Sequence, residues 1–139
     1  MDTSLWQIDL KSTIGGIYSR YQFWDKPIVI FNSASLCGFT NQLNEFETLY
    51  QSSKIVPIAI PTDNFGGQEP GDTLEIHQHY KKKYKVTYPI LDKATLEHGF
   101  FKLFGTPDWN FNKWLFDRKH VFVRRFDSKT TPEDLLDYV

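Results

Sequence analysis

Two short apolar segments constrain the fold of this 139-residue chain more than any other feature of its sequence. Residues 28–32 and 54–60 are rich in β-branched side chains, and neither segment alternates regularly with polar residues. Such continuous runs are typical of strands buried on both faces, as in the middle of a parallel sheet. Residues 40–51, which lie between them, have apolar side chains at helical spacing and predict a helix. We therefore expect two adjacent parallel strands joined by a right-handed helical crossover.

Further strands are expected on either side of this unit. They are residues 5–9, 17–21, 86–91, 111–117 and 120–126. The first two flank Gly15 and Gly16 and predict an N-terminal β-hairpin, and the last two predict a second hairpin. Strand and helix signals in this order predict an α/β fold, with a central mixed β-sheet flanked by helices.

Two more helices have clear start signals. Asp72 is the expected N-cap of a helix over residues 73–84, and Glu75 lies at its third position, where it completes a capping box. Thr131 is the expected N-cap of a final helix, with Pro132 at the first helical position. The stretch between the second buried strand and Asp72 is rich in glycine and polar turn residues, and it predicts a loop.

Length and composition favour a single domain, and we expect residues 1–139 to form it. The 16 basic and 17 acidic residues give a formal net charge of −1, which argues against nucleic-acid binding. No segment approaches the roughly 20 apolar residues of a membrane helix, and the N-terminus does not resemble a signal peptide. We therefore expect a cytoplasmic protein without stable membrane insertion.

The single cysteine, Cys37, follows the first buried strand and precedes the crossover helix. One cysteine cannot form an intramolecular disulfide or a multi-cysteine zinc site. At the start of a helix, unpaired backbone N–H groups and the positive end of the helix dipole favour the nucleophilic thiolate over the thiol. The neighbouring Gly38 allows close approach to the sulfur. An inert buried cysteine is the alternative, and position alone does not decide between the two.

Two other segments carry candidate side chains. Residues 65–71 (FGGQEPG) follow the second buried strand, so this loop should lie at the same sheet edge as Cys37. There, Gln68 could donate a hydrogen bond to a group on the sulfur, although a plain turn is the alternative. Trp109 and Asn110 follow a turn, and the alternatives for them are a core tryptophan and a turn asparagine.

The four histidines do not predict a metal site. His77 and His79 are two residues apart and therefore lie on different faces of their helix. His98 or His120 could in principle serve a cysteine–histidine hydrolase, but no local signature supports that reaction.

Taken together, three motifs resemble the Cys-containing branch of the glutathione peroxidase family. Residues 32–40 (NSASLCGFT) match the family pattern Asn-Val-Ala-Ser-x-Cys-Gly-x-Thr, with Ser33 in place of the valine. Residues 65–71 match the family loop without a change, and residues 109–111 match its Trp-Asn-Phe motif. The resemblance implies a thioredoxin-like fold. It also implies a catalytic tetrad, which would be Cys37, Gln68, Trp109 and Asn110.

The activity that the resemblance implies is a thiol-dependent reduction of hydrogen peroxide or organic hydroperoxides. The thiolate attacks one peroxide oxygen, the O–O bond breaks, and the sulfur becomes a sulfenic acid. Indole and carboxamide N–H groups can stabilise both the thiolate and the departing oxygen. The reaction needs no metal or organic cofactor, but a second thiol must reduce the sulfenic acid.

The sequence departs from the family where many members carry further cysteines. Tyr80 and Thr62 occupy the positions at which those members have a resolving or additional cysteine. Because only one cysteine is present, we expect glutathione or another external thiol as the reductant. The segment between Leu91 and Trp109 is shorter than in the tetrameric animal members of the family, so the resemblance suggests a compact monomer or at most a weak dimer. A non-catalytic alternative stays open, namely a peroxide sensor or partner-binding module in which Cys37 forms a mixed disulfide.

Overall fold

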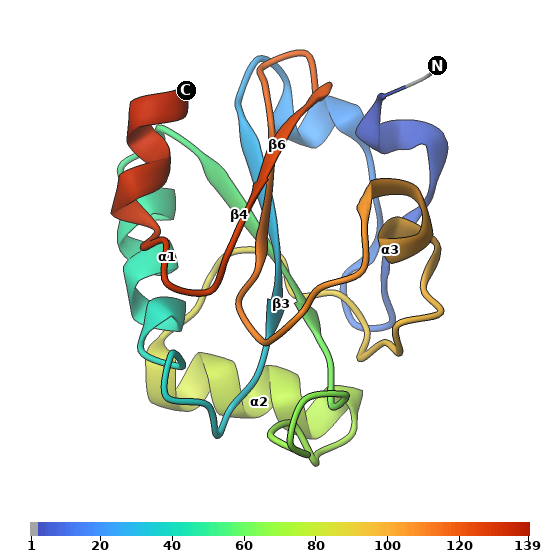
Figure 1. Ribbon diagram of the computed structural model, residues 1–139, viewed down its shortest axis with the longest axis vertical. Coiled ribbons are helices and arrows are strands. Elements are labelled where there is room, and N and C mark those ends of the chain that lie inside the picture. Colours follow the sequence, from blue (N-terminus) through green and yellow to red (C-terminus); the bar gives the residue numbers. More distant parts are fainter. Residues whose placement is uncertain (1–2) are drawn as a thin grey trace.

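A four-stranded mixed sheet forms the centre of the computed structural model, which describes residues 3–139 (Figure 1). Its strands lie in the order β4 (Val56–Pro61), β3 (Ile28–Ser33), β5 (Lys113–Phe116) and β6 (Phe122–Phe126). β3 and β4 are parallel, with Ile28 opposite Val56 and Ser33 opposite Pro61. β3 pairs antiparallel with β5, and β5 pairs antiparallel with β6. The predicted pair of adjacent parallel strands is therefore confirmed, and so is the second hairpin.

Helices cover both faces of this sheet (Figure 1). The helix α1 (Gln42–Gln51) and the C-terminal 3-10 helix η3 (Glu133–Tyr138) lie on one face, and α3 (Gly99–Phe104) lies on the other. Along β3, Val29 and Phe31 belong to the core on the α1 side, whereas Ile28 and Ile30 belong to the core on the α3 side. All four side chains are fully buried, which explains why this strand shows no polar alternation.

The predicted N-terminal hairpin is present, but the position of its first strand was wrong, since β1 shares no residue with the predicted strand over residues 5–9. It consists of β1 (Leu10–Ser12) and β2 (Gly16–Tyr18), which pair antiparallel. The residues predicted as the start of the first strand form a 3-10 helix instead, η1 (Leu5–Gln7), in which the side chain of Ser4 accepts a hydrogen bond from the Trp6 N–H. A second 3-10 helix, η2 (Arg20–Phe23), follows the hairpin.

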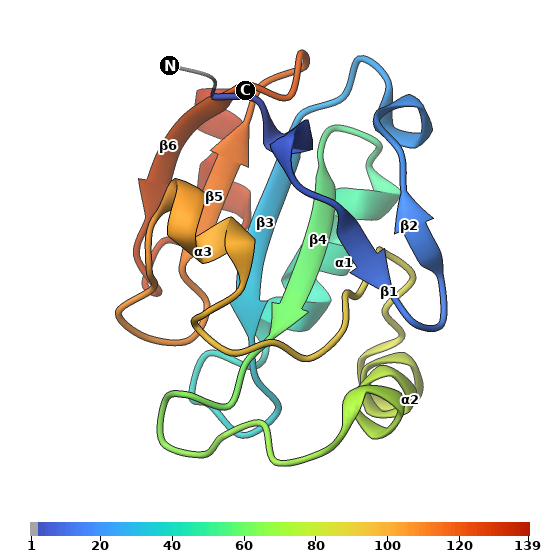
Figure 2. The same cartoon turned by 90° about the vertical axis from the view of Figure 1, so that its right-hand side faces the viewer.

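The helix α2 (Thr73–Tyr84) lies near the carboxyl end of the parallel strands and has the predicted bounds (Figure 2). Asp72 Oδ1 accepts a hydrogen bond from the Glu75 N–H at 2.9 Å, and Glu75 Oε1 accepts one from the Asp72 N–H at 3.3 Å. This reciprocal pair is the predicted capping box. Within residues 3–139, none of the helices is long and apolar enough to cross a membrane.

Between α2 and β5, one expected strand is absent and one helix is present that was not expected. Residues 86–91 do not form a strand, since only Ile90 makes an isolated parallel bridge, to Ala59 of β4. Pro89 lies beside this bridge and has no N–H group with which to extend a ladder. The helix α3 was not predicted at all. It is only six residues long and rich in aromatic side chains, which are typical of strands.

Candidate active site

The loops that follow β3 and β4 leave the sheet at the same edge, as the parallel pairing requires (Figure 2). The first loop carries Cys37 and the second carries Gln68. Two backbone hydrogen bonds join them, because the N–H groups of Ser35 and Leu36 donate to the carbonyl oxygen of Gln68 at 3.1 and 3.0 Å. The cysteine and the glutamine of two separate motifs therefore lie on loops that are fastened to each other.

Cys37 is partly exposed and lies in a tight turn. Its sulfur accepts a hydrogen bond from the Phe39 N–H at 3.4 Å, and its own N–H donates to Thr40 Oγ1 at 2.9 Å. The helix α1 begins at Gln42 rather than at the predicted Thr40, so the thiol lies outside the first helical turn. The amide that reaches the sulfur comes from the turn itself. A side chain at Gly38 would also find open space, so close approach to the sulfur does not require glycine there.

The side chains of Gln68 and Asn110 contact each other directly. Asn110 Nδ2 donates to Gln68 Oε1 at 2.8 Å and lies 3.5 Å from the carbonyl oxygen of Phe65. Asn110 is fully buried, and its Oδ1 has no hydrogen-bond partner. Because Gln68 uses its oxygen as the acceptor, its Nε2 group is left to donate elsewhere. None of the hydrogen bonds among residues 3–139 has Gln68 Nε2 as its donor, so this group can donate to a bound molecule.

Trp109 lies at the protein surface, with 38% of the residue exposed, and it is not a core tryptophan. Its ring packs against Phe65 of the Gln68 loop, with 5.6 Å between the ring centroids. Asn32, at the end of β3, holds the backbone of this segment, since its Nδ2 donates to the Trp109 carbonyl oxygen at 2.8 Å. Its Oδ1 also accepts from the Asn112 N–H at 2.9 Å. Sequence reasoning missed this role of Asn32, although a polar residue at the end of an apolar strand was a usable signal.

Two buried residues, Ser128 and Lys113, support the backbone of Asn110. Ser128 Oγ donates to the Asn110 carbonyl oxygen at 2.5 Å, and the Ser128 carbonyl oxygen accepts from Lys113 Nζ at 3.0 Å. Lys113 is fully buried, and this burial lowers its pKa to about 7. Nothing in the sequence marked Lys113 or Ser128 as neighbours of the site, because they come together only in the folded chain.

The histidines have structural contacts. His77 Nε2 lies 3.1 Å from the Leu91 carbonyl oxygen, and burial lowers the pKa of this imidazole. His120 Nδ1 accepts a hydrogen bond from the Trp6 indole N–H at 2.7 Å. In the part of the chain that the structure describes, no three histidine, cysteine, aspartate or glutamate residues are grouped so that they could hold a metal ion.

Comparison with known proteins identifies relatives of this chain. The glutathione peroxidase family model matches residues 5–102. Glutathione peroxidase-like peroxiredoxin GPX5 of Chlamydomonas reinhardtii is 36% identical over 79% of this chain and 78% of its own length. Glutathione peroxidase-like peroxiredoxin 2 of Saccharomyces cerevisiae is 34% identical over 97% of this chain and 94% of its own.

Solved structures agree with these sequence relationships. The crystal structure of Trgpx in its apo form is 26% identical and has a TM-score of 0.72, covering 99% of this chain and 94% of its own. A thiol:disulfide interchange protein of the thioredoxin family from Chlorobium tepidum has a TM-score of 0.66 at 14% identity, covering 94% and 88% of the two chains. The predicted thioredoxin-like fold is therefore confirmed. The chain belongs to the glutathione peroxidase family and is an oxidoreductase that reduces peroxide through a cysteine thiol.

Proposed function

We propose that Cys37 is the peroxidatic residue and that Gln68 and Trp109 donate hydrogen bonds to the reacting oxygens. The Cys37 thiolate attacks one oxygen of the hydroperoxide, and an S–O bond forms as the O–O bond breaks. The second oxygen leaves as an alcohol or water after it takes up a proton, and the sulfur becomes a sulfenic acid. Donors aimed at the departing oxygen stabilise the negative charge that develops on it.

One observation carries this assignment, namely the orientation of the Gln68 amide. Asn110 Nδ2 occupies Gln68 Oε1 at 2.8 Å, so the Nε2 group of Gln68 remains available as a donor. The Gln68 backbone is held against the loop of Cys37 by the N–H groups of Ser35 and Leu36. In this proposal Asn110 positions Gln68, and Trp109, which lies at the protein surface, supplies its indole N–H.

We further propose that the reductant is glutathione or another small external thiol. Cys37 is the only cysteine, so no second sulfur of the same chain can reduce its sulfenic acid. The first thiol molecule would displace water from the sulfenic acid and form a mixed disulfide. A second thiol molecule would then release reduced Cys37 and leave as the disulfide of the reductant. The cycle requires no metal or organic cofactor.

The proposal also covers the cellular compartment and the oligomeric state. A lone reduced cysteine suits a reducing compartment such as the cytoplasm. We also propose a monomer, because the segment between Leu91 and Trp109 is short and contains only the helix α3. Size-exclusion chromatography with light scattering, at several protein concentrations, tests the monomer directly.

A coupled assay with glutathione and glutathione reductase tests the reaction. The wild-type protein should consume NADPH in the presence of peroxide, and Cys37→Ser should not. Thr62→Ser serves as the control, since it changes one small residue, here a buried one, at the same sheet edge and should retain activity. Turnover with thioredoxin and none with glutathione would contradict the proposed reductant. A single oxidation of Cys37 without turnover by either thiol would favour the sensor.

A further inference from the structure

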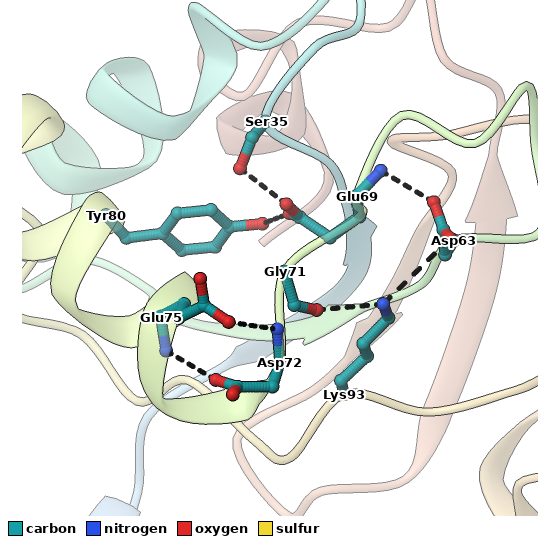
Figure 3. Close-up of polar contacts among 8 residues, drawn as sticks. All are labelled: Ser35, Asp63, Glu69, Gly71, Asp72, Glu75, Tyr80 and Lys93. Carbon is teal, nitrogen blue, oxygen red and sulfur yellow. Dashed lines mark hydrogen bonds and ion pairs between the residues drawn. The ribbon is translucent and has the colours of Figure 1, made fainter.

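Glu69, which follows Gln68 directly, has a buried carboxylate of which the proposed chemistry makes no use. It is only 1% exposed, and burial raises its pKa. A carboxylate in such a place needs hydrogen-bond donors to offset the loss of water. Ser35 Oγ donates to Glu69 Oε1 at 2.5 Å, and the Tyr80 hydroxyl donates to Glu69 Oε2 (Figure 3).

Tyr80 extends this network to the end of β3. Tyr80 belongs to α2 and is fully buried. Its hydroxyl oxygen lies 2.8 Å from Ser33 Oγ. A tyrosine hydroxyl has one proton, and here it is directed to Glu69, so Ser33 is the donor toward Tyr80. The resulting chain of hydrogen bonds runs from Ser33 through Tyr80 to Glu69, and from Ser35 to the other oxygen of the same carboxylate.

This network joins the same two loops that the proposed chemistry needs. Ser33 ends β3, Ser35 precedes Cys37 on the first loop, and Glu69 follows Gln68 on the second. We propose that Tyr80 and Glu69 are positioning residues that hold Gln68 in register with Cys37. The proposal rests on the proposed catalytic roles of Cys37 and Gln68, and it gives a function to Tyr80, which stands where the resemblance places a cysteine in many members of the family.

Other hydrogen bonds anchor the Gln68 loop on the side away from Cys37. The network can therefore fix the position of the whole loop. The Glu69 N–H donates to Asp63 Oδ1 at 2.9 Å. Lys93 Nζ donates to the Gly71 carbonyl oxygen at 2.8 Å and lies 3.9 Å from Asp63 Oδ2 (Figure 3). Residues on both sides of Glu69 are therefore anchored, and its carboxylate ties the anchored loop to the loop of Cys37. A misplacement of about 1 Å in a reacting group can cost roughly 100-fold in rate.

A pair of tyrosine variants separates positioning from general stability. Tyr80→Phe removes only the hydroxyl that donates to Glu69. Tyr88→Phe is the matched control, because Tyr88 is 2% exposed, belongs to the same apolar core, and donates its hydroxyl to the Leu43 carbonyl oxygen at 3.0 Å. Urea unfolding should show that both variants fold and lose comparable stability.

Two measurements on these variants test the proposal. The first is single-turnover loss of the Cys37 thiol with peroxide and no reductant, for which we expect Tyr80→Phe to react at least about fivefold more slowly than Tyr88→Phe. The same substitution made in a Gln68→Ala background should cause little further loss, because its effect passes through Gln68. Equal rates for the two tyrosine variants would overturn the proposal, and so would full additivity with Gln68→Ala.

The second measurement does not depend on catalysis. The amide N–H groups of Ser35 and Leu36 donate to the Gln68 carbonyl oxygen, so their hydrogen exchange reports whether the two loops stay together. We expect exchange at these amides to be at least tenfold faster in Tyr80→Phe than in Tyr88→Phe, and unchanged exchange would overturn the proposal. A wild-type protein whose Cys37 did not react with peroxide would refute the proposed function, and the exchange experiment would still decide whether the network holds the loops.

Discussion

In the proposed mechanism, Asn110 acts on the reacting centre through one hydrogen bond to Gln68. Its Nδ2 donates to Gln68 Oε1, and in the proposed mechanism this bond sets which end of the Gln68 amide faces the substrate. Asn110→Asp replaces the donor with an oxygen, which favours the opposite orientation of that amide. Since the loss of one aligned donor costs roughly 100- to 1,000-fold in well-studied enzymes, we expect at least about a tenfold slower reaction of Cys37 with peroxide. Stopped-flow measurement of thiol loss gives this rate constant.

The matched control for that variant is Asn44→Asp, which makes the same chemical change on the exposed side of α1. It should react with peroxide at the wild-type rate. If Asn110→Asp reacted as fast as Asn44→Asp, the orientation of Gln68 would not depend on Asn110.

Lys113 makes the stability of the protein depend on pH. Its pKa is lowered by burial to about 7 in the folded protein, whereas a lysine in the unfolded chain titrates near 10.4. Between these values the unfolded state binds more protons, so the free energy of unfolding rises with pH through this residue. The rise is at most about 1.4 kcal/mol per pH unit. Lys113→Met lacks the titrating group, so the stability of the wild type relative to this variant should increase from pH 7 to pH 9.

Urea unfolding of both proteins at several pH values measures this difference. The comparison ends at pH 9, below the range in which lysine and tyrosine side chains of the unfolded chain lose their protons. Parallel stability curves for the wild type and the variant would show that Lys113 keeps an ordinary pKa.

Single residues also show the limits of prediction from the sequence. Cys37 and Gln68 could be selected because each follows a buried strand in a recognisable motif. The partners that orient them could not be selected in this way. Asn32 contacts Trp109 across 77 positions, and Tyr80 reaches Ser33 across 47, so these pairs exist only after the strands and α2 have packed.

At the scale of elements, α2 owes its start to its own first turn. Asp72 and Glu75 satisfy backbone N–H groups that the helix leaves without partners. Asp72→Ala should therefore lower the free energy of unfolding by about 1 kcal/mol. Urea unfolding measures this loss, and Asp9→Ala, which removes an exposed carboxylate before β1, should leave the stability nearly unchanged. Equal stabilities for the two variants would mean that packing alone fixes the start of α2.

The difference between local sequence signals and tertiary packing explains which elements could be predicted. The bounds of α2 were correct because a capping box is a local signal. The cores of β3 and β4 were recognised because side chains buried on both faces give a continuous apolar run. The segment around Pro89 resembles a strand in composition, yet tertiary packing gives it only one bridge to β4. The helix α3 is capped by His98, whose ring nitrogen accepts the Phe100 N–H at 3.1 Å, and this unusual cap gave no usable signal.

At the scale of the whole molecule, the sheet and α2 hold the proposed reacting groups from several directions. β3 provides Asn32 for the segment of Trp109 and Ser33 for the network of Glu69. The core on both faces of β3 makes this strand a rigid support, because its apolar side chains are completely buried. The loops can therefore keep a fixed geometry although they lie outside the sheet.

The molecule as a whole has one thiol, and this determines how it should fail under oxidation. A sulfenic acid at Cys37 cannot be protected by an internal disulfide, so excess peroxide should oxidise it to a sulfinic acid. We expect intact mass spectrometry to show the gain of two oxygen atoms and a parallel, irreversible loss of activity. Glutathione added after one equivalent of peroxide should instead give one mixed disulfide, which further glutathione clears with recovery of activity. Cys37→Ser is the control and should show neither product. If the wild-type protein were treated with excess peroxide in the absence of any thiol and still kept its activity, this result would contradict the one-cysteine cycle.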